Sequence, residues 1–122
     1  MKNSIGIHAL VWSGTWNLKD IENSIKLSKQ LGYDLIEIPL LDPFNFDIKN
    51  TKKYLDKYKF NSVTSLGLSE ETDISSSEEQ HRINGKKILE KALDVTFELG
   101  SDYMGGVLYS ALAKYHHPPN NE

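Results

Sequence analysis

Four short apolar segments alternate with three longer amphipathic segments, and this alternation constrains the fold of the chain more than any other feature. Apolar runs of this length are typical of buried strands, and apolar residues at helical spacing are typical of helices packed on a sheet. The expected strands span residues 4–12, 35–38, 61–66 and 102–108, and the expected helices span 17–32, 47–58 and about 76–99. Successive parallel strands need such crossovers, so the sequence predicts an α/β fold with a parallel sheet.

Local signals support the two outer helices. Asn17 precedes the first helical segment and is a favoured N-cap, because its side chain can accept from an unpaired backbone N–H. Ser75 with Glu78, or Ser76 with Glu79, matches a capping box at the start of the third helix.

Two architectures fit four strands and three helices. One is a partial (β/α)₈ barrel, since 122 residues are about half of the roughly 250 that a full barrel contains. The other is a doubly wound binding domain, which would need a fifth strand and a further helix that the pattern lacks. We therefore expect residues 1–112 to form the N-terminal half of a barrel and residues 113–122 to form a loop or frayed end.

Composition excludes several classes of function. The chain has 14 basic and 17 acidic residues without a basic cluster, so nucleic acid is not an expected partner. It has no cysteine, which excludes disulfides and thiolate chemistry and fits a cytoplasmic protein. The apolar run at 5–12 is interrupted by His8, so we expect neither a signal peptide nor a membrane span.

Four stretches, in order and at similar spacing, carry a resemblance to a known family. They are residues 6–12 (GIHALVW) followed by Trp16, 32–38 (GYDLIEI), 65–68 (SLGL) and 105–110 (GGVLYS). Together they resemble the ketose 3-epimerases, the tagatose and psicose (allulose) group of the xylose isomerase-like TIM barrels. The resemblance covers nearly the whole chain, from Ile5 to about Ser110.

The resemblance implies a metal-dependent sugar epimerase. In this family a divalent cation (Mn²⁺, Mg²⁺ or Co²⁺) holds two oxygens of a ketose; one glutamate removes the C3 proton, an enediolate forms, and a second glutamate returns a proton to the opposite face. These glutamates and the metal ligands belong to later strands, so the resemblance assigns no catalytic residue and no metal ligand to this chain. It implies an N-terminal fragment that binds no metal and is inactive without its C-terminal half.

The positions that the resemblance does carry over form a substrate wall for a ketose. Family members often place a tryptophan where this chain has Leu112. The expected substrate-binding residues are His8, Trp16, Glu37, Ser65, Gly67, Gly106 and Val107.

The residues alone leave other interpretations open. His8 on an apolar strand is often a core histidine, and Glu37 between two isoleucines needs either a site or a structural ion pair to explain it. Trp16 could be an ordinary rim aromatic. The adjacent His116 and His117 lie beside two prolines and are expected in an exposed loop rather than in a metal site.

Three functional hypotheses follow. The first is the fragment of a ketose 3-epimerase, and the second is another member of the same superfamily, such as an aldose–ketose isomerase, a hydroxypyruvate-type isomerase or an inosose dehydratase. The third is a complete, non-enzymatic doubly wound domain. For a half-barrel we also expect self-association or pairing with the missing half, because both edges of its sheet would be open.

Overall fold

A computed structural model describes residues 3–114 of the chain. Its sheet contains four parallel strands in the order β1-β2-β3-β4, each strand paired with its neighbour in the sequence. The strands are β1 (Gly6–His8), β2 (Leu35–Pro39), β3 (Asn61–Leu68) and β4 (Met104–Ala111).

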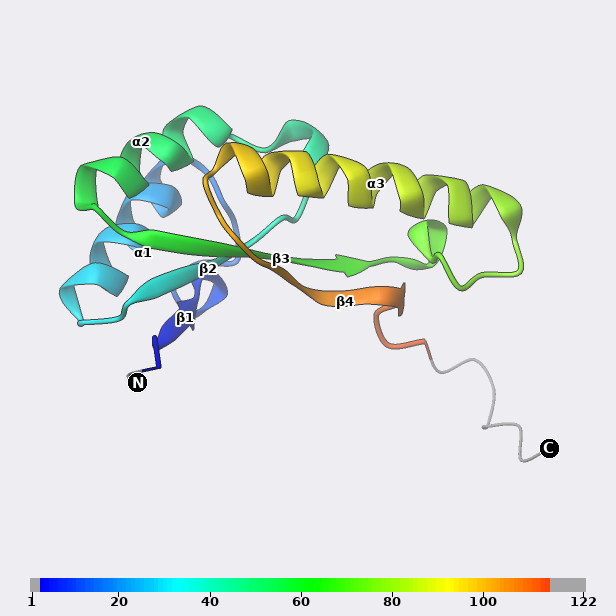
Figure 1. Cartoon of the computed structure of the whole chain (residues 1–122), viewed down its shortest axis with the longest axis horizontal. Helices are drawn as coiled ribbons and strands as arrows, with labels where there is room; N and C mark the ends of the chain where they lie inside the picture. Colours follow the sequence, from blue (N-terminus) through cyan, green and yellow to red (C-terminus); the bar gives the residue numbers. More distant parts are fainter. Residues whose placement is uncertain (1–2, 115–122) are drawn as a thin grey trace.

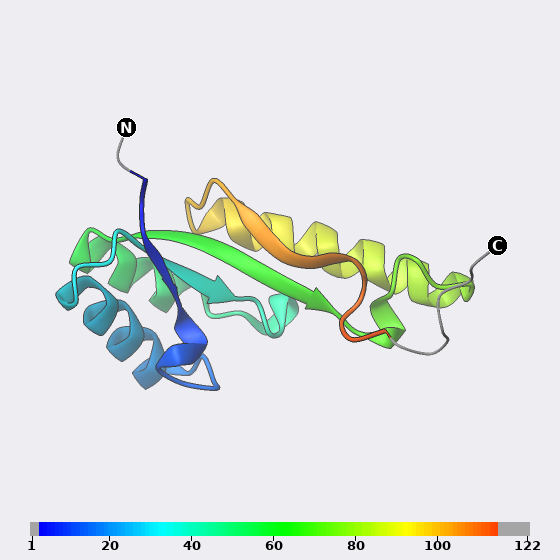
Figure 2. The same ribbon diagram turned by 90° about the horizontal axis from the view of Figure 1, so that it is seen from below.

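Three helices connect the strands and lie on the same side of the sheet (Figures 1 and 2). Right-handed crossovers that all advance in one direction place their helices on one face, as in a barrel. A doubly wound sheet reverses its strand order and covers both faces, so the sequential order excludes that alternative for the described residues. The helices are α1 (Leu18–Gln30), α2 (Ile48–Tyr58) and α3 (Glu79–Glu98).

The core lies between the sheet and this helical layer. Ile36 and Ile38 of β2 are fully buried and pack with Ile21 and Ile25 of α1. A second cluster lies farther along the sheet and joins β3 to α3 through Leu40, Leu66, Leu68, Ala92, Val95 and Leu99. Because side chains alternate along a strand, residues between the buried ones point to the opposite, open face of the sheet.

The first strand is shorter than the sequence predicts. Residues 4–12 were expected to be one strand buried on both faces, but β1 ends at His8 and a 3₁₀ turn, η1 (Ala9–Val11), follows. The Leu10 amide donates to His8 Nδ1 at 3.1 Å, which favours this turn. Val11 is 65% exposed, so this apolar residue lies at the surface and not in a buried strand.

The start of α3 also differs from the expectation. Glu78 is the N-cap residue and its side chain makes no capping bond, so neither predicted capping box forms. Ser76 Oγ instead accepts from the Glu78 amide at 3.1 Å, one residue before the helix. A capping box does occur at the preceding 3₁₀ turn, η3 (Glu70–Thr72), where Ser69 and Thr72 pair.

The other predicted boundaries are close to the observed ones. Asn17 caps α1 as expected, accepting from the amides of Lys19 and Asp20. β3 and β4 each run further toward their carboxyl ends than predicted, to Leu68 and Ala111. Residues 115–122, including His116 and His117, lie outside the described residues. No helix among residues 3–114 is both long and apolar enough to cross a bilayer.

Candidate functional site

A cavity of about 400 Å³ lies on the open face of the sheet, at the carboxyl ends of the strands. All four strands contribute to it, which is the position where loops after parallel strands build active sites. We call it the inner-face cavity, and its lining residues are His8, Leu10, Glu37, Pro39, Leu40, Leu41, Ser65, Leu66, Gly67, Gly106, Val107 and Leu112.

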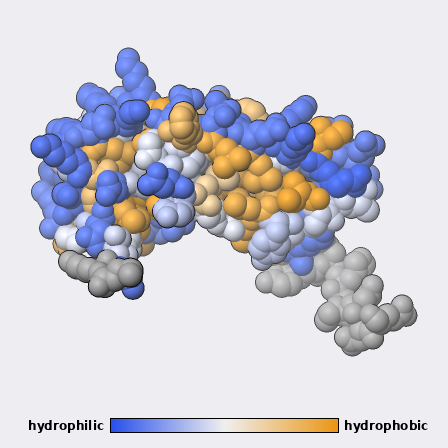
Figure 3. All heavy atoms as spheres, viewed as in Figure 1, coloured by the Kyte–Doolittle hydropathy of each residue, from blue (hydrophilic) through white to orange (hydrophobic). Residues whose placement is uncertain are grey.

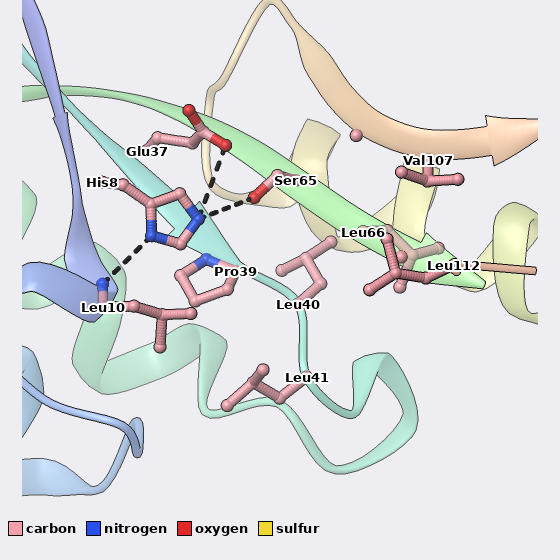
Figure 4. Close-up of a pocket in the computed structure, with 12 residues that line it drawn as sticks. His8, Leu10, Glu37, Pro39, Leu40, Leu41, Ser65, Leu66, Val107 and Leu112 are labelled. Atoms are coloured by element: carbon pink, nitrogen blue, oxygen red, sulfur yellow. Dashed lines mark hydrogen bonds and ion pairs between the residues drawn. The ribbon is translucent and has the colours of Figure 1, made fainter. Parts of the chain in front are cut away.

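The strand register brings the polar residues of this cavity together. His8 is the partner of Glu37 between β1 and β2, and Pro39 is the partner of Ser65 between β2 and β3. Partners in parallel strands point to the same face, so residues far apart in the sequence converge. Figure 4 shows His8, Glu37 and Ser65 at one end of the cavity and Leu66, Val107 and Leu112 at the other.

His8 is the centre of this polar end. Its Nε2 lies 3.5 Å from Glu37 Oε1 and 3.4 Å from Ser65 Oγ, while Nδ1 accepts from the Leu10 amide. The side chains of His8 and Glu37 are 34% and 41% exposed, so both groups are accessible to a ligand. Glu37 therefore lies on an open face with a partner, and not as the isolated carboxylate of a strand buried on both sides.

Gly106 is required by the backbone that forms the wall of the cavity. Its φ is +111°, and a Cβ there would collide with the carbonyl oxygen of Leu66 on the neighbouring strand. Gly67 is different, because a Cβ at that position would meet only the Leu112 side chain, at an ordinary 3.7 Å. Of these two glycines, only Gly106 lies so close to a neighbouring backbone that a side chain has no room.

Trp16 lies outside the inner-face cavity. It lines a neighbouring pocket of about 210 Å³ that shares Pro39 and Leu41 with the cavity. The Trp16 indole N–H donates to the buried Thr51 hydroxyl at 3.0 Å, so this polar group is already satisfied within the protein. The other six expected residues, His8, Glu37, Ser65, Gly67, Gly106 and Val107, all line the cavity.

Sequence reasoning missed most of the apolar part of the lining. Leu40 and Leu41 directly follow β2, and Leu112 directly follows β4, so their place at strand ends is the signal that could have identified them. Leu66 was missed for another reason, because it also belongs to the core cluster under α3.

The described residues do not fit a metal ion. No three histidine or acidic side chains among residues 3–114 lie close enough together to hold one. His8 and Glu37 supply two potential ligands, whereas protein metal sites of the catalytic type usually use three or more. We therefore derive no chemical step through a metal from this part of the chain.

A second polar cluster holds the segment after β4 against the loop after β3. Lys114 Nζ donates to Asp73 Oδ2 at 2.7 Å, and Ser75 donates to Oδ1 of the same carboxylate. Asp73 is only 2% exposed. The Lys114 ammonium holds the pKa of Asp73 well below its usual range, and the hydrogen bonds from Ser75 act in the same direction. This ion pair fixes the chain just beyond Leu112.

Comparison with solved structures defines the class of fold. D-allulose 3-epimerase from Methylomonas sp., solved in complex with D-allulose, superposes with a TM-score of 0.91 at 42% identity over 97% of this chain and 41% of that one. An L-ribulose 3-epimerase gives a TM-score of 0.87 at 29% identity. The fold is thus that of part of a TIM-barrel epimerase.

Sequence comparison gives the family. The chain is 41% identical to the ketose 3-epimerase of Arthrobacter globiformis over 114 residues, and 43% identical to the L-ribulose 3-epimerase of Methylomonas sp. strain DH-1 over 117 residues. These two matches cover 93% and 96% of this chain, but only 39% and 41% of the length of the two relatives. No family profile matches the chain. The chain is a homologue of the ketose 3-epimerases and corresponds to the N-terminal portion of that family.

Proposed function

We propose that this chain is the substrate-binding wall of a metal-dependent ketose 3-epimerase and has no epimerase activity without the rest of the barrel. The observation that carries the proposal is the inner-face cavity at the carboxyl ends of four parallel strands, in a chain over 40% identical to ketose 3-epimerases. The Methylomonas relative binds D-allulose, which supports a ketose as the ligand of this cavity.

In this proposal six residues contact the sugar. His8, Glu37 and Ser65 offer hydrogen bonds at the polar end, while Gly67, Gly106 and Val107 form a wall against which the carbon chain of the sugar packs. A direct role for Trp16 remains a prediction. Its position beyond Pro39 and Leu41 would require the sugar to reach the rim of the cavity.

The remaining parts of the epimerase lie outside the described residues in this proposal. In this proposal the part of the relatives that the match does not cover supplies the carboxylates that move the C3 proton. The same part would supply the ligands of a divalent cation such as Mn²⁺, Mg²⁺ or Co²⁺. The metal-free character of the N-terminal portion and a cytoplasmic location both stay predictions.

The open edges of the sheet support a pairing role. Among the described strands, β1 and β4 each have one neighbour, so each leaves a row of backbone groups without a strand partner. Figure 3 shows apolar surface between α3 and β4. Leu93 and Phe97, both on α3, are large apolar side chains that are exposed. We propose that these edges pair with the complementary part of a barrel, and that copies of the chain associate with one another when it is absent.

Reconstitution tests the proposed function. The chain should show no conversion of D-allulose to D-fructose by itself, even with Mn²⁺ added. When it is co-expressed with the remaining portion of the Methylomonas enzyme, we expect an assembled barrel with measurable epimerase activity. Activity of the chain alone, or an assembled barrel that acts on none of a panel of ketoses, would contradict the proposal.

The same experiment separates the superfamily alternatives. Aldose–ketose isomerases, hydroxypyruvate-type isomerases and inosose dehydratases share the scaffold, so the fold does not choose among them. Products identified by chromatography do choose, because only a 3-epimerase converts one ketose into another that differs at C3.

A further inference from the structure

The tautomer of His8 is fixed by its own backbone. A neutral imidazole has one nitrogen that donates and one that accepts. The Leu10 amide can only donate, and it lies 3.1 Å from His8 Nδ1. Nδ1 is therefore the acceptor, and the proton of the neutral ring is on Nε2, which points into the inner-face cavity (Figure 4).

The two acceptors near this proton are both at long distance. Nε2 lies 3.5 Å from Glu37 Oε1 and 3.4 Å from Ser65 Oγ, whereas a well-formed N–H···O bond measures about 2.9 Å. The N–H is thus shared between two weak contacts and can form a stronger one. Among the described residues His8 is the only polar partner of Glu37, so most of the acceptor capacity of that carboxylate is unused.

A hydroxyl group matches this arrangement. It can accept from His8 Nε2–H through a lone pair and donate its own proton to the Glu37 carboxylate, which satisfies both side chains. A carbonyl oxygen cannot donate to Glu37, and an anionic group would be repelled by it. No lysine or arginine is among the described residues that line the cavity, so nothing there offsets that repulsion.

We propose that His8 and Glu37 act as a donor–acceptor pair that binds one hydroxyl group of a polyol ligand and thereby fixes how the ligand lies in the cavity. The inference rests on the proposed function, since that function supplies the hydroxyl-rich ligand. It goes further by assigning the two roles: Nε2–H donates, the carboxylate accepts, and the Leu10 amide keeps His8 in the required tautomer.

The test uses the chain itself and two NMR measurements. The first is a long-range ¹H–¹⁵N spectrum of the imidazoles at alkaline pH, which is expected to show an unprotonated Nδ1 and a protonated Nε2 at His8. The second is a titration with D-allulose, followed through the backbone amides of Ser65, Gly67 and Gly106. The wild-type chain should show saturable shifts at these amides.

The variants remove one role at a time. His8→Phe keeps a planar ring without a donor, and Glu37→Gln keeps the shape of the side chain without its charge. Each should weaken binding by about tenfold or more, as expected for loss of a hydrogen bond to a charged or fixed partner. Glu37→Gln should leave the His8 tautomer unchanged, because the Leu10 amide sets it. Glu90→Gln, an exposed carboxylate on α3, is the matched control and should bind as the wild type does.

The outcomes separate the inference from the proposed function. If D-allulose binds the wild type and both variants equally, or if His8 carries its proton on Nδ1, the inference is overturned together with the hydrogen bonds proposed for His8 and Glu37. The epimerase function itself then stands, because reconstitution of the barrel tests it independently. If the wild-type amides do not respond to D-allulose, the inference is also overturned. The proposed epimerase function is then decided by the activity of the reconstituted barrel alone. If His8→Phe fails to fold, Glu37→Gln decides alone, since it leaves the Leu10 contact intact.

Discussion

At the scale of single residues, Gly106 is the position that the backbone constrains most. Its positive φ and the adjacent Leu66 carbonyl leave no room for a side chain. Gly106→Ala should therefore lower the free energy of unfolding by about 1–3 kcal/mol, the usual cost of a residue held in an unfavourable backbone region. Urea denaturation followed by circular dichroism measures this change.

The neighbouring glycine is a matched control. A Cβ at Gly105 would meet nothing within 4 Å, so Gly105→Ala should change the stability far less. Equal effects of the two substitutions would show that the close approach of β3 and β4 at Gly106 is not what makes glycine necessary there.

The ion pair between Asp73 and Lys114 predicts a pH dependence of stability. Lys114 lowers the pKa of Asp73 in the folded chain, so folding favours the ionised carboxylate. This stabilisation is fully present above the ordinary Asp pKa of 3.8 and is lost as the pH falls through the lower folded value. Asp73→Asn should be less stable than the wild type at pH 7, and the difference should shrink toward pH 2.

Thermal unfolding between pH 2 and pH 7 checks this prediction. Lys114→Gln should reproduce part of the loss at pH 7, because it removes the cation but keeps Ser75 as a donor to Asp73. A difference between Asp73→Asn and the wild type that stays constant over the whole range would contradict the account.

Six of the seven expected substrate-binding residues line the inner-face cavity, and their contact with a sugar stays a prediction. Glu37 drew attention because a carboxylate between two isoleucines is unusual, and that signal is local in the sequence. The resemblance predicts a substrate contact for Trp16, whose side chain lines the neighbouring pocket that shares Pro39 and Leu41 with the cavity. Where a loop carries an aromatic residue depends on contacts such as the one with Thr51, which no local pattern reveals.

At the scale of secondary-structure elements, the packing of α3 depends on Gly85. A Cβ there would collide with the Thr72 carbonyl of η3 and with the Ile74 side chain. Helix propensity alone would make Gly85→Ala stabilising by up to about 1 kcal/mol, but overpacking usually costs about 1–3 kcal/mol. We therefore expect a net loss of stability, measurable by chemical denaturation. Lys87→Ala, at an exposed position of the same helix, is the control and should be nearly neutral.

The elements themselves were largely predictable, but the end of β1 and the start of α3 were not. The alternation of apolar and amphipathic segments identified the four strands and three α-helices of the described residues, because periodicity reflects which face of an element is buried. It could not show that the strand at His8 gives way to a 3₁₀ turn, since both conformations accommodate the apolar residues 9–11. Neither capping box predicted for α3 forms, and the box that does form, between Ser69 and Thr72, caps a short 3₁₀ turn that the pattern did not indicate.

At the scale of the whole molecule, the open edges dominate the expected behaviour. Phe97 on α3 is 84% exposed, and β4 is an edge strand of the described sheet. We expect the chain to self-associate at concentrations at which an ordinary small domain is monomeric, as sedimentation velocity over a dilution series would show. Phe97→Lys should shift the distribution toward monomer.

Lys53→Glu provides the comparison, because Lys53 is exposed on α2, between the two edges. It should leave the distribution unchanged. A monomer that persists at high concentration and unfolds in one cooperative transition would show that the edges need no partner.

The most direct test of the central claim is to find which carbon atom of the sugar exchanges its hydrogen with the solvent when the reconstituted barrel acts on it. The chain, assembled with the remaining portion of the Methylomonas enzyme, is incubated with D-allulose in D₂O, and the sugar is examined by NMR. A ketose 3-epimerase removes and returns the proton at C3, so deuterium should appear at C3 of both D-allulose and D-fructose. Deuterium at C1, or the formation of an aldose, would contradict the account and identify an aldose–ketose isomerase instead.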